Sequence, residues 1–101
     1  MAYETKKPRM NSRYILRLYV TGAMPRSVRA ISNIKAICEK YLTNRYQLEV
    51  IDIYQHPLAA KDEQIVAAPT LIRKSPLPMR TLVGDMSDKR RVLAGLDLEE
   101  D

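Results

Sequence analysis

The clearest periodicity in the chain predicts one amphipathic helix. Between Ser27 and Leu42, apolar residues recur at intervals of three and four positions, which gathers them on one helical face. They are Ala30, Ile31, Ile34, Ile37, Cys38 and Tyr41. Pro25 suits the first turn of such a helix, because an N–H at that position would have no intrahelical partner. The sequence therefore predicts a helix over residues 27–42.

Two segments on either side of this helix have the composition of strands. Residues 13–20 mix alternation with β-branched and aromatic side chains and end at a Thr-Gly pair that favours a tight turn. Residues 46–54 follow the same pattern and end before the His56-Pro57 break. A strand, a helix and a second strand in this order indicate a parallel pair joined by a right-handed crossover.

The second half of the chain carries shorter signals. Residues 58–66 favour a helix, and residues 70–72 favour a strand. Residues 75–78 are rich in proline and predict a turn, after which residues 80–83 have the pattern of a short strand. We therefore expect one helix and two strands between residues 58 and 83.

The last element combines helical and strand signals. Ser87 can cap a helix whose apolar positions are Val92, Leu93 and Leu96. Gly95 lies inside that helix, where glycine costs about 1 kcal/mol relative to alanine. Residues 96–98 alternate as in a strand. We predict a helix here, and we expect the part of the chain from residue 58 onward to adopt two folds, because ambivalent segments are what a two-state element requires.

The predicted order, βαβ followed by α, β, β and α, resembles that of a thioredoxin-like domain. Ala68-Pro69-Thr70 is similar to the proline-threonine pair that opens the third thioredoxin strand, where the proline is commonly cis. Residues 23–26 stand where a redox thioredoxin carries Cys-x-x-Cys, and they contain no thiol. We interpret Cys38, on the apolar stripe of the first helix, as a small buried hydrophobic residue. These features argue against disulfide exchange.

The composition is that of one globular domain with a modest core. Of the 101 residues, 46% are hydrophobic, and the lack of Phe and Trp leaves aliphatic residues, methionines and six tyrosines to build the core. A small core favours self-association, and we expect a dimer or tetramer when the protein is free. We divide the chain into a flexible basic arm (1–12), one domain (13–98) and a short acidic tail (99–101).

Few residues offer chemistry for a catalytic or metal site. Cys38 is the single cysteine and His56 the single histidine, which leaves no thiol pair and no zinc ligand set. The three glycines are scattered, and the carboxylates at residues 62–63 and 85–88 have the pattern of helix-start and exposed helical charges. We therefore expect no enzyme, no cofactor and no metal. The sequence contains no secretory or membrane-spanning run, so we expect a cytoplasmic protein.

The net charge of +5 indicates a partner of opposite charge. Basic residues are distributed over the first helix, the third and fourth strands and the last helix. They are Arg26, Arg29, Arg73, Lys74, Arg80, Lys89, Arg90 and Arg91. No RRM, KH or helix-turn-helix signature accompanies them, so we favour an acidic protein surface over nucleic acid as the partner.

Three stretches of the chain resemble the KaiB family of bacterial timing proteins, and together they span most of residues 13–98. The first is the opening strand and turn at residues 14–22, followed by Pro-x-Ser-Val-Arg-Ala at residues 25–30. The second is Ala68-Pro69-Thr70-Leu71. The most specific is Gly-Asp-Met-Ser-Asp at residues 84–88, followed by Val-Leu-Ala-Gly-Leu-Asp-Leu at residues 92–98.

The resemblance implies a regulatory protein without catalysis that exists in two folds. The free form is often tetrameric and departs from thioredoxin topology in its C-terminal half, whereas the bound form is monomeric, thioredoxin-like (βαβαββα), and docks on a KaiC-type hexameric ATPase. In cyanobacterial clocks the bound form also captures KaiA and displaces a sensor kinase with a related domain. The family's basic contact positions correspond to Arg29, Arg73 and Arg80, and we place the fold-switch hinge at Gly95 and Pro69.

An alternative function from another class is a thiol-independent, thioredoxin-like stress or redox accessory protein. The ends of the chain depart from the usual family pattern, with a longer basic arm and an acidic end at residues 98–101. This departure leaves the tetramer and any role with KaiA less supported than the docking itself. Binding to a KaiC-type ATPase separates the two functions.

Overall fold

Strand β1 lies inside a sheet that pairs both halves of the chain. The computed structural model describes residues 12–100, and within them the sheet has four strands in the order β2-β1-β3-β4. β1 pairs in parallel with β2 and antiparallel with β3, and β3 pairs antiparallel with β4. The elements are β1 (Tyr14–Val20), α1 (Pro25–Tyr41), β2 (Tyr46–Asp52), α2 (Pro57–Asp62), β3 (Thr70–Ser75), β4 (Arg80–Val83) and α3 (Lys89–Gly95). The thioredoxin-like order βαβαββα is confirmed.

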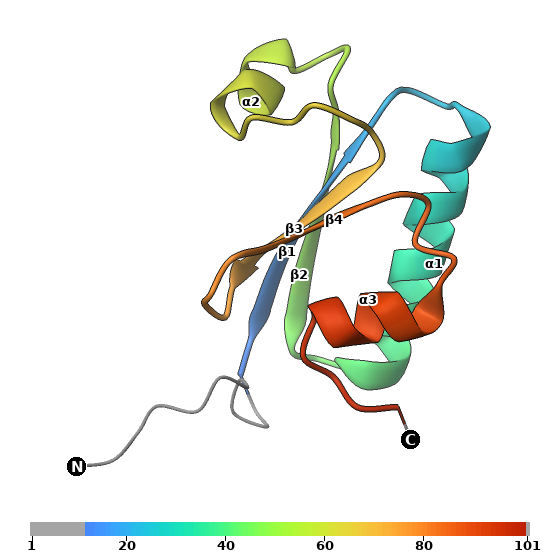
Figure 1. Cartoon of the computed structure of the whole chain (residues 1–101), viewed down its shortest axis with the longest axis vertical. Coiled ribbons are helices and arrows are strands. Elements are labelled where there is room, and N and C mark those ends of the chain that lie inside the picture. Colours follow the sequence, from blue (N-terminus) through green and yellow to red (C-terminus); the bar gives the residue numbers. More distant parts are fainter. Residues whose placement is uncertain (1–11, 101) are drawn as a thin grey trace.

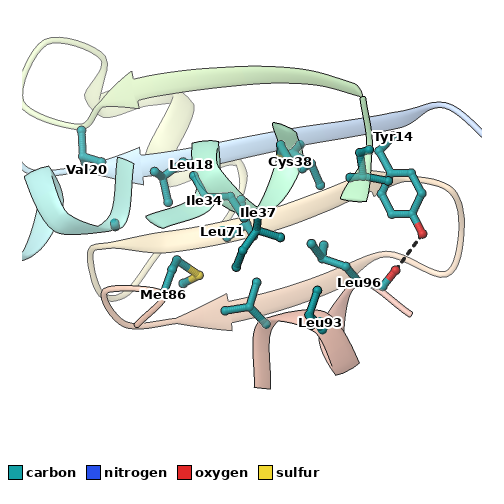
Figure 2. Packing of buried hydrophobic residues seen from close by; sticks show 14 residues of the cluster. Tyr14, Leu18, Val20, Ile34, Ile37, Cys38, Leu71, Met86, Leu93 and Leu96 are labelled. Carbon is teal, nitrogen blue, oxygen red and sulfur yellow. Dashed lines mark hydrogen bonds between the residues drawn. The ribbon is translucent and has the colours of Figure 1, made fainter. Parts of the chain in front are cut away.

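Helices α1 and α3 cover one face of the sheet (Figure 1). Leu16 and Leu18 of β1 point to this face because alternate strand residues share a side, and both are fully buried. They pack with the apolar stripe of α1, where Ile34 and Cys38 are also fully buried (Figure 2). From the C-terminal half, Leu71, Met86, Val92, Leu93 and Leu96 complete this core. The two halves therefore share one hydrophobic core.

A buried hydrogen bond joins the two ends of the domain. The hydroxyl group of Tyr14, at the start of β1, donates to the backbone carbonyl of Leu96 at 2.7 Å (Figure 2). The side chain of Tyr14 is almost fully buried, and burial is the main cause that raises the pKa of its hydroxyl above the ordinary value. Tyr14 therefore holds the segment after α3 against the first strand.

The opposite face of the sheet has a thinner cover. The short helix α2 follows β2 at one end of the sheet (Figure 1). Beside it lies a hollow of about 260 Å³ between the segment after α2 and strand β4, with the buried side chain of Ile72 among its lining. Its rim exposes Val66 at 95% and, to a lesser extent, Met79 and Val83.

Several predicted boundaries are shifted. The first helix begins at Pro25, two residues earlier than expected, and the second strand ends at Asp52. The helix predicted over residues 58–66 is wrong beyond Asp62, because Gln64 takes a left-handed conformation with φ of +57° that ends the helix. β3 continues to Ser75, where it still pairs with β1.

Helix α3 is shorter than the sequence suggested and has a different cap. The side chain of Asp88, not that of Ser87, accepts the backbone N–H of Arg91 at 3.2 Å. The helix ends at Gly95, and Asp97 follows with φ of +58°, so residues 96–98 form no strand in this fold. The Ala68–Pro69 peptide bond is cis, as the resemblance implied.

Part of what was predicted for the two ends of the chain cannot be compared with the structure. The predicted basic arm falls almost entirely on residues 1–11, which lie outside the described residues, as does Asp101.

Within residues 12–100, no helix has the length and apolar character needed to cross a membrane.

Candidate functional site

Arg73 of β3 points into the protein. Its side chain is buried, with 1% of the residue exposed, and its Nη1 atom donates to Oδ2 of Asp97 at 2.9 Å. Its Nη2 atom donates to the backbone carbonyl of Pro78 at 2.8 Å. Arg73 therefore joins β3 to the β3–β4 turn and to the segment after α3, and its guanidinium group does not lie on the surface of this fold.

Arg80 and Arg29 lie on the surface at opposite ends of β4. The side chain of Arg80 is 43% exposed, and its Nη2 atom lies 3.9 Å from Oδ2 of Asp97. Arg29, on α1, is 54% exposed and donates from Nε to Oδ2 of Asp85 at 3.3 Å. Arg80 is the first residue of β4, and Asp85 lies two positions beyond its last residue, Val83, so the two arginines lie at different ends of the strand. The structure does not gather the three predicted arginines into one cluster.

The loop that carries Asp85 is held by several bonds. Oδ1 of Asp85 accepts the backbone N–H of Ser87 at 3.1 Å, and Nδ2 of Asn33 donates to the backbone carbonyl of Asp85 at 2.9 Å. The hydrogen bonds from Ser87, with a smaller contribution from Arg29, lower the pKa of the Asp85 carboxyl. Asp85 therefore stays charged and fixes this end of β4 against α1.

The two expected hinge residues, Gly95 and Pro69, both lie close to β4 or to the residue that follows it. A Cβ atom on Gly95 would lie 2.7 Å from Cδ1 of Leu82, so the glycine lets the end of α3 approach β4. Pro69 is buried, and its carbonyl accepts the backbone N–H of Gly84 at 2.9 Å. Both residues lie where the C-terminal elements meet, and their role in a fold change stays a prediction.

The mouth of α1 contains no reactive thiol. Within residues 23–26 the helix begins at Pro25, and Oγ of Ser27 accepts the backbone N–H of Thr21 at 3.0 Å, which closes the turn. Cys38 is fully buried, and burial raises the pKa of its thiol to about 12. The interpretation of Cys38 as a buried hydrophobic residue is confirmed, and its thiol stays protonated at neutral pH.

His56 and the acidic residues do not form a metal site in the described part of the chain. His56 is exposed at the start of α2. Among residues 12–100, no three side chains of His, Cys, Asp and Glu come together in a group that could hold a metal ion.

An ionic cluster that was not predicted from the sequence lies on the face of the sheet opposite α1 and α3. Oε1 of Glu63 accepts Nζ of Lys74 at 2.7 Å and Nη1 of Arg17 at 3.0 Å. Nε of Arg17 also lies 3.2 Å from Oε1 of Glu49. Glu63 had the pattern of an exposed helical charge, and this was wrong because the helix ends before it. Charged residues at alternate strand positions opposite to Leu16 and Leu18 were the available signal.

Comparisons with known proteins agree with this geometry. The sequence matches the KaiB domain over residues 17–98. It is 45% identical over 87 residues to "Circadian clock protein KaiB3" of Synechocystis sp., covering 86% of this chain and 85% of that protein. It is 48% identical over 85 residues to "Circadian clock oscillator protein KaiB" of Synechococcus elongatus, covering 84% of this chain and 83% of that protein.

Solved structures with the same fold are more distant in sequence. The N-terminal domain of SasA from Synechococcus elongatus superposes with a TM-score of 0.70 at 20% identity, covering 99% of this chain and 98% of that one. Mitochondrial thioredoxin 3 from Saccharomyces cerevisiae gives a TM-score of 0.69 at 12% identity, covering 88% and 82%. These structures establish a thioredoxin-like fold, and the sequence match establishes the family: the chain belongs to the KaiB family.

Proposed function

We propose that this protein is a clock-type regulator that docks on a KaiC-type hexameric ATPase and thereby modulates its phosphorylation or output timing, without catalysis of its own. The observation that carries the proposal is the match to the KaiB domain over residues 17–98, together with relatives that are named circadian clock proteins. The buried, protonated Cys38 argues against disulfide exchange, and the thiol-independent accessory function is separated from docking by the binding experiment below.

The charge distribution supports an acidic docking partner. The chain carries a net charge of +5, and Arg29 and Arg80 are exposed at the two ends of β4. Exposed charges of this kind steer association and raise its rate more than they raise final affinity. We assign Arg29 and Arg80 to the docking contact, and we assign Arg73 to the support of that surface because its guanidinium group is buried.

We also propose that the C-terminal half of the protein exchanges between two folds. The thioredoxin-like arrangement is the binding-competent one, and the free protein exchanges with a dimeric or tetrameric form in which residues from 58 onward fold differently. Gly95 and Pro69 are the hinge. SasA is a candidate competitor, because the likeness of its N-terminal domain to this chain supports competition for one docking site. KaiA is a further proposed partner.

The proposal is tested by mixing the protein with a purified KaiC-type ATPase and measuring the complex by native mass spectrometry. We expect this chain on the ring, and a change in the time course of ring phosphorylation when it is added. A competing SasA N-terminal domain should lower the occupancy. Absence of a complex over days of incubation would contradict the proposal and favour the thiol-independent accessory function.

A further inference from the structure

Two guanidinium groups border one small space beside Gly84. Arg26 comes from the first turn of α1 and Arg91 from α3, while Gly84 follows β4 with φ of +126°. A Cβ atom on Gly84 would lie 3.7 Å from Nη1 of Arg91 and 4.0 Å from Nη2 of Arg26. The two nitrogens therefore lie no more than about 8 Å apart, a span that one carboxylate group bridges when each oxygen accepts a bond of about 2.8 Å.

The neighbouring cations already have carboxylate partners. Arg29 pairs with Asp85 at 3.3 Å, and Glu100 lies 3.5 Å from Lys89 and 3.9 Å from Arg90. In the part of the chain that the structure describes, the side chains of Arg26 and Arg91 form no ion pair with a carboxylate. The first turn of α1 contains no acidic residue. Among residues 12–100, no carboxylate neutralises these two positive charges.

The acidic side chains that follow Gly84 in sequence are engaged elsewhere. Asp85 accepts bonds from Arg29 and from the backbone of Ser87. Asp88 accepts the backbone N–H of Arg91 as the cap of α3, which directs its carboxylate toward the helix end. Neither carboxylate is bonded to the guanidinium groups of Arg26 or Arg91.

The loop at residues 84–85, beside the two arginines, is held in place before any partner arrives. The N–H of Gly84 donates to the carbonyl of Pro69 at 2.9 Å, and Asn33 donates to the carbonyl of Asp85 at 2.9 Å. A loop fixed in this way loses little conformational entropy on binding, which favours affinity. Beside Arg26, Met24 and Val28 expose apolar surface on the same end of α1, at 56% and 51%.

We infer that Arg26 and Arg91 together bind one carboxylate side chain on the docking segment of the partner. The inference rests on the proposed function and adds to it a contact outside the three arginines of the family pattern. Arginine suits this role because its planar group donates two parallel bonds to a carboxylate, and arginines surrounded by apolar contacts are common centres of binding energy. Gly84 lies beside both groups, since a Cβ atom there would come within 4.0 Å of each of them.

The test compares two double variants that remove the same charge from the same two helices. The first is Arg26→Gln with Arg91→Gln. The control is Lys35→Gln with Arg90→Gln, which removes one cation from α1 and one cation from α3 that Glu100 already neutralises. Both sets of positions are exposed, so both variants should fold, which circular dichroism checks.

Binding to the KaiC-type ring is measured by surface plasmon resonance at several salt concentrations. We expect the first variant to bind roughly ten-fold more weakly with a smaller salt dependence, and the control to stay within about two-fold of the wild type. In the complex, the side-chain N–H signals of Arg26 and Arg91 should also become protected from exchange.

Two outcomes overturn the inference in distinguishable ways. If the wild type binds and both double variants bind equally well, the carboxylate contact is wrong while the proposed function stands. If the wild type does not bind the ring at all, the proposed function fails and the contact fails with it.

Discussion

The buried guanidinium group of Arg73 donates to the carboxylate of Asp97 at 2.9 Å, across 24 positions of sequence. This bond and the one to the carbonyl of Pro78 hold the segment after α3 and the β3–β4 turn on the same strand. Loss of either partner would leave a buried charged group or carbonyl without a hydrogen bond, which is costly. The bonds of Arg73 therefore favour this one arrangement of the C-terminal half on the sheet.

Replacement of Arg73 by glutamine should destabilise the thioredoxin-like fold. The variant loses both bonds, and we expect the free energy of unfolding to fall by about 2–3 kcal/mol, which urea unfolding measures. Arg80→Gln is the matched control, because its contact with Asp97 is 3.9 Å long and exposed, so its effect should stay within about 0.5 kcal/mol. Equal effects at the two positions would contradict the assignment of Arg73 to support.

We expect the buried thiol of Cys38 to make the protein less stable at alkaline pH. Burial raises the pKa of its thiol from the ordinary 9.0 to about 12, so the folded protein keeps a proton that the unfolded chain releases. A raised pKa gives stability that is fully present below pH 9 and is lost as the pH rises toward 12, at up to about 1.4 kcal/mol per unit. Cys38→Ala should not show this component. Parallel stability curves for the two proteins between pH 8 and 11 would refute it.

We expect the stabilising contribution of Glu63 to be lost at acidic pH. The hydrogen bond from Lys74, followed by the attraction of Lys74 and Arg17, holds the pKa of Glu63 below its ordinary 4.5. A lowered pKa gives stability that is present above pH 4.5 and is lost as the pH falls through the folded value. At neutral pH, Glu63→Gln should cost about 1.5 kcal/mol in urea unfolding, and the difference from wild type should shrink below pH 4. A difference independent of pH would show that the ionised carboxylate is not what holds this segment.

The sequence predicted the first half of the fold well and the second half less well. The helix starting at Pro25 and the flanking strands have strong periodicity and are long enough for local signals to dominate. Residues 58–98 consist of elements of four to seven residues, and their boundaries depend on tertiary bonds such as those of Asp88 and Glu63. Such bonds leave no periodic trace in the sequence.

The candidate site shows the same limit. Arg29 and Arg80 are exposed and their role in docking stays a prediction, whereas the burial of Arg73 follows from its register opposite Leu16 and from the position of Asp97. The proximity of Arg26 and Arg91 joins two helices that are distant in sequence. Only the folded chain brings such residues together.

Gly95 provides a test of the proposed exchange between two folds. An alanine at this helical position gains up to about 1 kcal/mol of helix propensity, but its methyl group would lie 2.7 Å from Cδ1 of Leu82, so the Leu82 side chain must shift, which reduces that gain. Gly95→Ala should therefore raise the thioredoxin-like population modestly, and Gly95→Ala with Leu82→Ala should remove the contact that opposes it. NMR peak ratios for residues 58–98 measure the two populations. A single unchanged set of peaks in all three proteins would contradict the proposed exchange between two folds.

Docking is tested most directly by measuring the association of this protein with a KaiC-type ring at low and high salt. We predict a complex whose formation is slow, because only the thioredoxin-like population binds, and whose association rate falls with salt. Arg29→Glu with Arg80→Glu should slow association at low salt and flatten the salt dependence. A ring that stays free, or a double variant that associates as fast as the wild type at low salt, would contradict the proposed docking surface.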